Sequence, residues 1–216
     1  MSILSAAQVD EAGLADWRLL RQRLQTRYRT GSWATGIALV NAISSVAEEA
    51  NHHPDVDLRY GHLNVRLQSH DVGGVTGRDV RMARKITGLA QDAGVTADPS
   101  ALAVVELGLD TPEMERVRPF WTAVLGGQQG ADSDEVRNDA ADVVPLWFQP
   151  SGSEEPRQRF HLDVSLPPEQ VEERLKAAVA AGGTVVSREQ EPAFIVLADP
   201  DGNKVCLCTS LGRDGG

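Results

Sequence analysis

The second half of the chain contains a weak internal repeat, which constrains the fold more than any other feature of the sequence. Each copy begins with a strand-like run, continues with a helix that follows a proline, and then passes a Gly-Gly pair into further strands. Pro112 and Pro168 lie 56 residues apart, and so do the Gly-Gly pairs that begin at Gly126 and Gly182. The expected elements are strand 102–109, helix 112–124 and strand 143–149, then strand 160–166, helix 168–181 and strands near 185, 194–197 and 205–208. We expect a turn over 199–203 and a mobile loop over the acidic stretch 130–142.

Charge is distributed unevenly along the 216 residues, whose formal net charge is −10. The first hundred residues hold 11 basic and 11 acidic side chains, whereas the rest hold 10 basic and 20 acidic ones. This asymmetry favours two domains, and the acidic second half argues against nucleic acid as a partner. No apolar run approaches the roughly 18 residues of a membrane span, and the N-terminus has no signal-peptide pattern. We therefore expect a cytoplasmic protein that does not bind membranes.

The first half alternates helical and strand patterns. Apolar spacing predicts helices over 13–28 and 33–51, the second ended by Pro54, and a half-buried strand over 60–69. Thr76 and Asp79 form the pattern of a capping box that opens a third helix. The small and polar residues 91–100 suggest a linker, so we expect domains over 1–95 and 101–212. Cys206 and Cys208 lie on one predicted strand and are expected to remain reduced thiols.

Three of the five histidines, His52, His53 and His70, are expected to form one constellation in the first half, with Glu48 and Asp79 nearby in the sequence. Imidazole titrates near neutral pH, which suits it to proton transfer in both directions. Glu48 precedes His52 by four residues and is expected to orient it across one helical turn. Alternatively, the His-His-Pro run is simply a helix terminus and Asp79 serves only as a cap.

One string of residues resembles the pattern of the pterin-4a-carbinolamine dehydratase family. It runs from Glu48 through His52-His53-Pro54 and continues with Tyr60, His70 and Asp79 at the spacing of that family. The resemblance covers roughly residues 10–95. It implies an α+β fold in which a four-stranded antiparallel sheet carries helices on one face, and a homo-oligomer, either dimer or tetramer. Two positions depart from the family pattern, where Val56 replaces a frequent tryptophan and Leu39 a frequent phenylalanine; both would shape the pocket wall.

The resemblance implies loss of water from a 4a-hydroxytetrahydropterin, a lyase reaction that needs no cofactor. His53 and His70 would then be acid and base in unassigned order, and His52 would contact the departing hydroxyl or relay its proton. Glu48 and Asp79 would orient the histidines. The expected substrate-binding residues are Pro54, Asp55, Val56 and Tyr60.

The repeated unit of the second half, with Trp121–Gly127 and Asp199–Asn203, resembles the glyoxalase/bleomycin-resistance (vicinal oxygen chelate) superfamily, which implies paired βαβββ modules around one cleft. Metal-dependent members place one ligand on each of four strands. The corresponding positions here are Ala103 or Val105, Gln149, His161 and Cys206, and only two of them suit a metal. We therefore expect no metal, with a divalent ion at His161 and Cys206 as the alternative, while Glu106 is left facing either the cleft or solvent.

Three interpretations remain open at this stage. The first is an active pterin dehydratase with an appended glyoxalase-like domain. The second is that the glyoxalase-like half is the enzyme, a lyase or dioxygenase, while the first half mediates assembly. The third is a binding module in which the halves hold small molecules without turnover.

Overall fold

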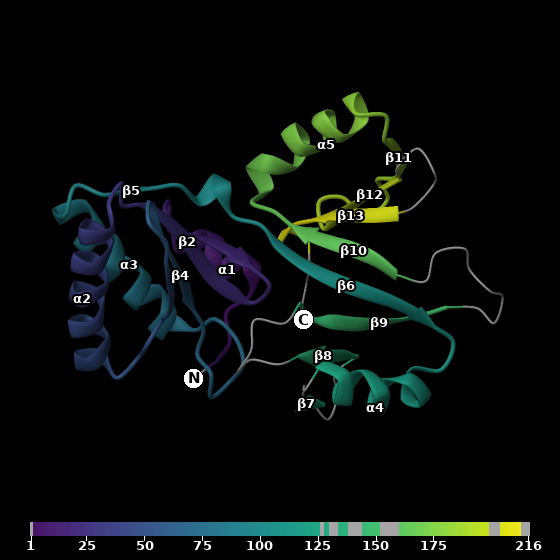
Figure 1. Cartoon of the computed structure of the whole chain (residues 1–216), viewed down its shortest axis with the longest axis horizontal. Helices are drawn as coiled ribbons and strands as arrows, with labels where there is room; N and C mark the ends of the chain where they lie inside the picture. The colour runs from purple at the N-terminus through teal and green to yellow at the C-terminus, as the bar shows by residue number, and fades with distance from the viewer. Residues whose placement is uncertain are drawn as a thin grey trace. The chain divides into compact units, whose positions relative to one another are not determined.

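The computed structural model of the chain describes residues 2–125, 128–129, 134–137, 144–151, 160–198 and 204–212. Contacts between Cα atoms divide the chain into two compact units, formed mainly by residues 1–103 and 104–208. Each unit is described by itself, and Figure 1 labels their elements. Among the helices in the described ranges, none is long and apolar enough to cross a membrane.

The first unit is built on an antiparallel sheet with the strand order β1-β2-β4-β3, and a short strand β5 pairs with β2. Its elements are α1 (Ala6–Glu11), β1 (Arg18–Leu20), β2 (Arg23–Arg29), α2 (Trp33–Ala50), β3 (Asp55–Leu58), β4 (His62–Leu67), α3 (Gly77–Asp92), β5 (Thr96–Ala97) and a 3-10 turn, Pro99–Ala101. The predicted α+β class and four-stranded antiparallel sheet are confirmed, with β5 as an addition.

The core of this unit lies between the sheet and its two long helices. Leu63, Val65 and Leu67 of β4 are fully buried and belong to one apolar cluster with Ile43 of α2 and Ile86 of α3. The alternation of apolar residues in β4 therefore faces the helices, as the sequence predicted. Figure 1 shows α2 and α3 on the same side of the sheet.

The predicted helix over residues 13–28 is wrong, because this segment forms the hairpin β1–β2. Leu24 and Tyr28 are four residues apart, which fits one face of a helix and equally one face of a strand. Both are buried in β2, opposite Leu67 and Leu63 of β4. The turn uses Arg21 and Gln22 at positive φ, without the Asn-Gly or Asp-Gly pair that marks such hairpins in a sequence.

The other boundaries of the first unit agree more closely with expectation. The predicted helix over 33–51 is α2, which ends at Ala50 with Asn51 as its cap. The capping box of Thr76 and Asp79 opens α3 as predicted. The interpretation of 91–100 as a linker is wrong, because α3 extends to Asp92 and β5 pairs with the end of β2.

The second unit repeats the order strand, helix, three strands, so the predicted paired βαβββ modules are confirmed. The first module contains β6 (Val104–Thr111), α4 (Met114–Leu125), β7 (Gln128–Gln129), β8 (Glu135–Arg137) and β9 (Leu146–Pro150). The second contains β10 (Phe160–Ser165), a 3-10 turn (Pro168–Gln170), α5 (Val171–Ala180), β11 (Thr184–Ser187), β12 (Phe194–Ala198) and β13 (Lys204–Cys208).

One eight-stranded sheet joins the two modules in the order β11-β12-β13-β10-β6-β9-β8-β7. The first strands of the modules, β10 and β6, pair antiparallel at its centre, and each is parallel to the last strand of its own module. Because β8 falls within 130–142, the interpretation of that whole stretch as a loop is wrong. The Gly126-Gly127 pair and the predicted turn over 199–203 lie outside the described residues.

Candidate functional site

The end of α2 directs the two adjacent histidines to different environments. Asn51 caps the helix in the left-handed conformation, with φ of 45°, which asparagine tolerates better than most residues. The backbone N–H of His52 then donates to the carbonyl of Ala47 at 3.1 Å. His52 is buried beneath the helix end, with 9% of its surface exposed, while His53 is exposed.

Asp79 holds the buried histidine from the first turn of α3. Its Oδ1 lies 2.8 Å from Nε2 of His52, although the two residues are 27 positions apart in the chain. Its Oδ2 accepts from the hydroxyl of Ser69 at 2.7 Å and from the backbone N–H of Thr76 at 2.7 Å. The Thr76 hydroxyl lies 3.2 Å from the same oxygen. Asp79, itself fully buried, is thus a helix cap through one oxygen and a histidine partner through the other.

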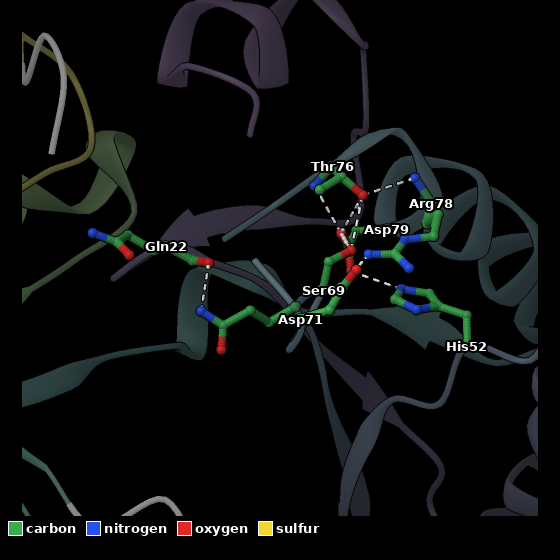
Figure 2. A network of polar contacts seen from close by, with 8 residues as sticks. Gln22, His52, Ser69, Asp71, Thr76, Arg78 and Asp79 are labelled. Atoms are coloured by element: carbon green, nitrogen blue, oxygen red, sulfur yellow. Dashed lines mark hydrogen bonds and ion pairs between the residues drawn. The ribbon is translucent and has the colours of Figure 1, made fainter. Parts of the chain in front are cut away.

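Figure 2 shows the His52 ring directed at this cluster of Ser69, Thr76 and Asp79. A carboxylate only accepts hydrogen bonds, so Nε2 of His52 carries the proton in this contact. The pair therefore fixes the orientation and tautomer of the ring, which leaves Nδ1 as its remaining nitrogen. Such a fixed, buried imidazole is suited to contacting or relaying a proton of a bound molecule.

Glu48 pairs with His53 and not with His52, so the expected Glu48–His52 contact is wrong. Oε1 of Glu48 lies 3.1 Å from Nε2 of His53, and both side chains are more than half exposed. The reason is the turn at Asn51, which breaks the helical spacing on which the expectation rested and brings His53 back toward the last turn of α2.

His70 lies in the exposed turn after β4 and not on the polar face of the strand. It directly follows Ser69, whose hydroxyl donates to Asp79. The same turn holds Asp71, which forms an ion pair with Arg78 of α3. The hydrogen bond from Arg78 lowers the pKa of the Asp71 carboxyl.

The expected substrate-binding residues gather around β3, an edge strand of the sheet. Asp55 and Val56 are exposed on this strand, Pro54 precedes it partly buried, and Tyr60 follows it with 77% of its surface exposed. Leu39 was expected in the pocket wall. This expectation is wrong, because Leu39 lies in the apolar core with 1% of its surface exposed.

Sequence reasoning missed Ser69 as part of this constellation. Thr76 had a signal in its capping-box spacing, but a single serine before His70 has no pattern of its own. Its role depends on the turn Ser69–Gly74, where a bridge between the two residues brings the end of β4 back to the start of α3.

In the second unit, strand register corrects the expected first ligand position. His161 of β10 faces Gly108 of β6, and Asp163 faces Glu106. Paired residues share a face of a sheet, so Glu106 and Gly108, rather than Ala103 or Val105, lie on the face of His161. This also decides the orientation of Glu106, which is buried on that face.

The remaining cleft positions lie on the same face of this sheet. Cys206 of β13 pairs with Asp163, and Gln149 of β9 pairs with Asp110 of β6. Cys206 and Cys208 are reduced and not joined in a disulfide. The structure therefore brings His161 and Cys206 together as expected, and it adds Asp163 to them.

Comparison with known protein families divides the chain at the same place as the fold. Residues 2–89 match the family model described as pterin 4 alpha carbinolamine dehydratase, and residues 106–208 match that of a glyoxalase-like domain. A protein from Aquifex aeolicus is 37% identical over 79 residues, which cover 37% of this chain and 80% of the relative. A protein from Nocardia farcinica is 37% identical over 91 residues, covering 41% and 96%. Both are named "Putative pterin-4-alpha-carbinolamine dehydratase".

Solved structures resemble each half separately. One from Brucella melitensis, described as a transcriptional coactivator/pterin dehydratase, is 27% identical with a TM-score of 0.40 and covers 41% of this chain and 99% of that one. One from Vibrio splendidus, of the glyoxalase/bleomycin resistance protein/dioxygenase superfamily, is 17% identical with a TM-score of 0.33 and covers 50% and 99%.

Proposed function

Because the chain belongs to the pterin-4a-carbinolamine dehydratase family through residues 2–89, we propose that its first unit dehydrates a 4a-hydroxytetrahydropterin. In this reaction the C4a–O bond breaks and the hydroxyl leaves with a proton as water. The ring N5 loses its proton, and a C4a=N5 double bond forms in the quinonoid dihydropterin. Atoms balance without an oxidant or a metal, so the protein has to supply one acid and one base.

The observation that carries this proposal is the buried hydrogen bond between His52 and Asp79. Two exposed histidines accompany it: His53 follows His52 in the chain, and His70 follows Ser69, which contacts Asp79. His53 and His70 supply the acid and the base, in an order that the proposal leaves open. His52, fixed by Asp79, contacts the departing hydroxyl or relays its proton. Glu48 holds the ring of His53.

The expected binding residues are consistent with a flat, polar bicyclic substrate. Val56 and Tyr60 offer exposed apolar and aromatic surface near the edge strand β3, and the Asp55 carboxylate lies exposed between the Pro54 turn and Val56. Carboxylates accept hydrogen bonds from amino and ring N–H groups of the kind that a pterin carries. We propose that these residues bind the substrate while the histidines act on it.

Turnover of a 4a-hydroxytetrahydropterin generated in situ, followed by the absorbance of the quinonoid product, tests this function on the full chain. We expect a rate above the spontaneous dehydration, and losses of roughly 10²–10⁴-fold in His53→Ala and His70→Ala, limited by the spontaneous rate. His62→Ala is the matched control, because His62 lies on the polar face of β4 outside the constellation. A wild-type rate equal to the spontaneous one would overturn the proposal, and so would an equal loss in His62→Ala.

A second candidate function has one specific observation in its favour. His161, Asp163 and Cys206 converge on one face of the glyoxalase-like sheet, which is where a small-molecule enzyme of this fold class would act. In that case the first unit would serve assembly, and the histidine variants above would leave the activity of the chain unchanged.

A further inference from the structure

The turn that joins β4 to α3, residues 69–74, holds one titratable side chain without a partner between two that are bonded. His70 is exposed, and its side chain makes no hydrogen bond or ion pair in the part of the chain that the structure describes. On either side of it, the hydroxyl of Ser69 and the carboxylate of Asp71 are both bonded to side chains of α3, as Figure 2 shows. The unpaired imidazole of His70 is therefore carried by a turn whose neighbouring side chains are held in place.

Backbone hydrogen bonds close this turn on itself and tie it to the N-terminal segment. The N–H of Gly73 donates to the carbonyl of Ser69 at 2.9 Å, and the N–H of Ser69 donates to the carbonyl of Gly74 at 3.0 Å. Just beyond the turn, the carbonyl of Val75 accepts from the N–H of Leu4 at 2.8 Å. A turn with this many hydrogen bonds has little freedom to move its exposed histidine.

A buried glutamine adds a further tie to the turn. Gln68 directly follows β4 and exposes 7% of its surface. Its Nε2 donates to the carbonyl of Gly73 at 2.9 Å and lies 3.5 Å from the carbonyl of Gln22, while its Oε1 accepts from Nε of Arg23 at 3.1 Å. The amide uses both its donor and its acceptor, so one side chain joins the turn to the hairpin of β1 and β2.

The hairpin that Gln68 contacts has a strained turn of its own. Arg21 and Gln22 adopt the left-handed conformation, with φ of 47° and 56°, which glycine and asparagine adopt far more readily than longer side chains. Such a conformation persists where the surrounding structure holds it, and it is frequent at functional sites. Gln68 is part of what holds it here, through the carbonyl of Gln22 and the side chain of Arg23. The same amide thus holds the strained hairpin and the turn that carries His70.

We propose that Gln68 is a positioning residue for the dehydration assigned to the first unit, an inference that rests on the function proposed above. Gln68 is buried and acts through the backbone, because it holds the carbonyl of Gly73 and with it the turn from which His70 projects. A displacement of about 1 Å in a group that transfers a proton lowers the rate by up to about 100-fold. An imidazole that no side chain holds depends for its position on the backbone beneath it, which makes the Gln68 amide part of the catalytic geometry.

The test compares Gln68→Ala and Gln68→Glu with the wild type in the full chain, by two measurements. The first is the steady-state dehydration of a 4a-hydroxytetrahydropterin, in which kcat should fall about 10–100-fold while KM stays within about threefold. The second is hydrogen exchange at the backbone N–H of Gly73, which should become at least about tenfold faster because the turn opens more often. A carboxylate at position 68 still accepts from Arg23 but cannot donate to the Gly73 carbonyl, so both variants should show both changes.

Gln25→Ala is the matched control, because Gln25 is a second buried glutamine of the same sheet, with 6% of its surface exposed. Its Nε2 donates to the carbonyl of Leu20 at 3.1 Å, within the same hairpin but away from the turn that carries His70. We expect Gln25→Ala to lower the denaturation midpoint by an amount comparable to that of Gln68→Ala, and to keep the wild-type kcat and the wild-type exchange at Gly73. A purely structural role of Gln68 predicts the same result for both variants.

The outcomes separate this proposal from the dehydratase function on which it rests. A wild-type kcat in Gln68→Ala, or an unchanged exchange rate at Gly73, would overturn the positioning role. An equal loss of kcat in Gln25→Ala would also overturn it. A wild-type protein no faster than spontaneous dehydration would overturn the function itself, and the exchange rate would then still decide whether Gln68 fixes the turn. Far-ultraviolet circular dichroism of each variant confirms that the fold is retained.

Discussion

Each unit contains a histidine with little exposed surface beside aspartate, but the two arrangements differ in how closely their polar atoms approach one another. Around His52, Oδ1 of Asp79 contacts the ring at 2.8 Å and Oδ2 contacts Ser69 and the backbone of Thr76. Around His161, the nearest carboxylate oxygens stand 3.6 Å away on both sides. The first is a closed hydrogen-bond network, whereas the second holds its carboxylate oxygens beyond hydrogen-bond distance of the ring.

The comparison shows that the role of a histidine–aspartate pair depends on the distance between the ring nitrogen and the carboxylate oxygen. A carboxylate in hydrogen-bond contact fixes the tautomer of the imidazole and prepares it for proton transfer. Carboxylates beyond hydrogen-bond distance leave the orientation of the ring to its packing, here against Gly108 and Trp147. Changing one residue of each arrangement should therefore alter the free energy of unfolding by unequal amounts in the two units.

The largest effect on stability is expected for Asp79→Ala. The change leaves Ser69, Thr76 and His52 without their common acceptor in a buried site, so we expect a loss of about 3–5 kcal/mol in the free energy of unfolding, measured by denaturant titration. Glu48→Ala is the control from the exposed pair and should cost about 0.5 kcal/mol or less. Equal losses in the two variants would mean that Asp79 is not the centre of a closed network.

A smaller loss is expected for Gly108→Ala in the second unit. The added Cβ overlaps the His161 ring, and displacing the ring should lower the free energy of unfolding by about 1–3 kcal/mol. Gly88→Ala is the control of opposite sign, since Gly88 lies inside α3 with open space around it. That variant should gain roughly 0.5–1 kcal/mol. An unchanged free energy of unfolding in Gly108→Ala would mean that the position of the His161 ring does not depend on the missing side chain.

A further prediction concerns the free energy of unfolding at alkaline pH, which depends on the core of the first unit. Burial raises the pKa of Tyr28 to about 12, against about 10 for an ordinary tyrosine. The folded state therefore keeps this proton above pH 10 while the unfolded state loses it, so stability falls as the pH rises from about 10 to 12. We expect Tyr28→Phe to flatten this fall by about 1–3 kcal/mol at pH 12.

Tyr60 provides the control for that experiment, as the other tyrosine of the chain, with 77% of its surface exposed. Tyr60→Phe should leave the alkaline decline in the free energy of unfolding as steep as in the wild type. The opposite pattern, with the decline flattened only in Tyr60→Phe, would contradict the assignment to Tyr28.

Sequence patterns predicted the elements whose signal is local. The alternation of Leu63, Val65 and Leu67 identified β4, and Thr76 with Asp79 identified the start of α3. The hairpin of β1 and β2 was missed because a four-residue spacing of apolar side chains fits a helix and a strand alike, and its turn has no glycine.

The sequence indicated which residues belong to the candidate site better than it indicated which of them contact one another. The spacing of His52, His53, His70 and Asp79 marked the constellation, but only the left-handed Asn51 decides which histidine meets Glu48. Asp163 was missed because its place beside Cys206 is set by the pairing of β10 with β13, and nothing in the sequence of β10 alone indicates that pairing. Long-range pairing of this kind is set by tertiary structure and not by local pattern.

The most direct test of the central claim measures 4a-hydroxytetrahydropterin dehydration in parallel for the wild type, His53→Ala and Cys206→Ser. The claim assigns proton transfer to the first unit and gives Cys206 of the second unit no part in it. It predicts a wild-type rate above the spontaneous one, retained in Cys206→Ser and reduced to near the spontaneous rate in His53→Ala. A rate that falls in Cys206→Ser but persists in His53→Ala would contradict it.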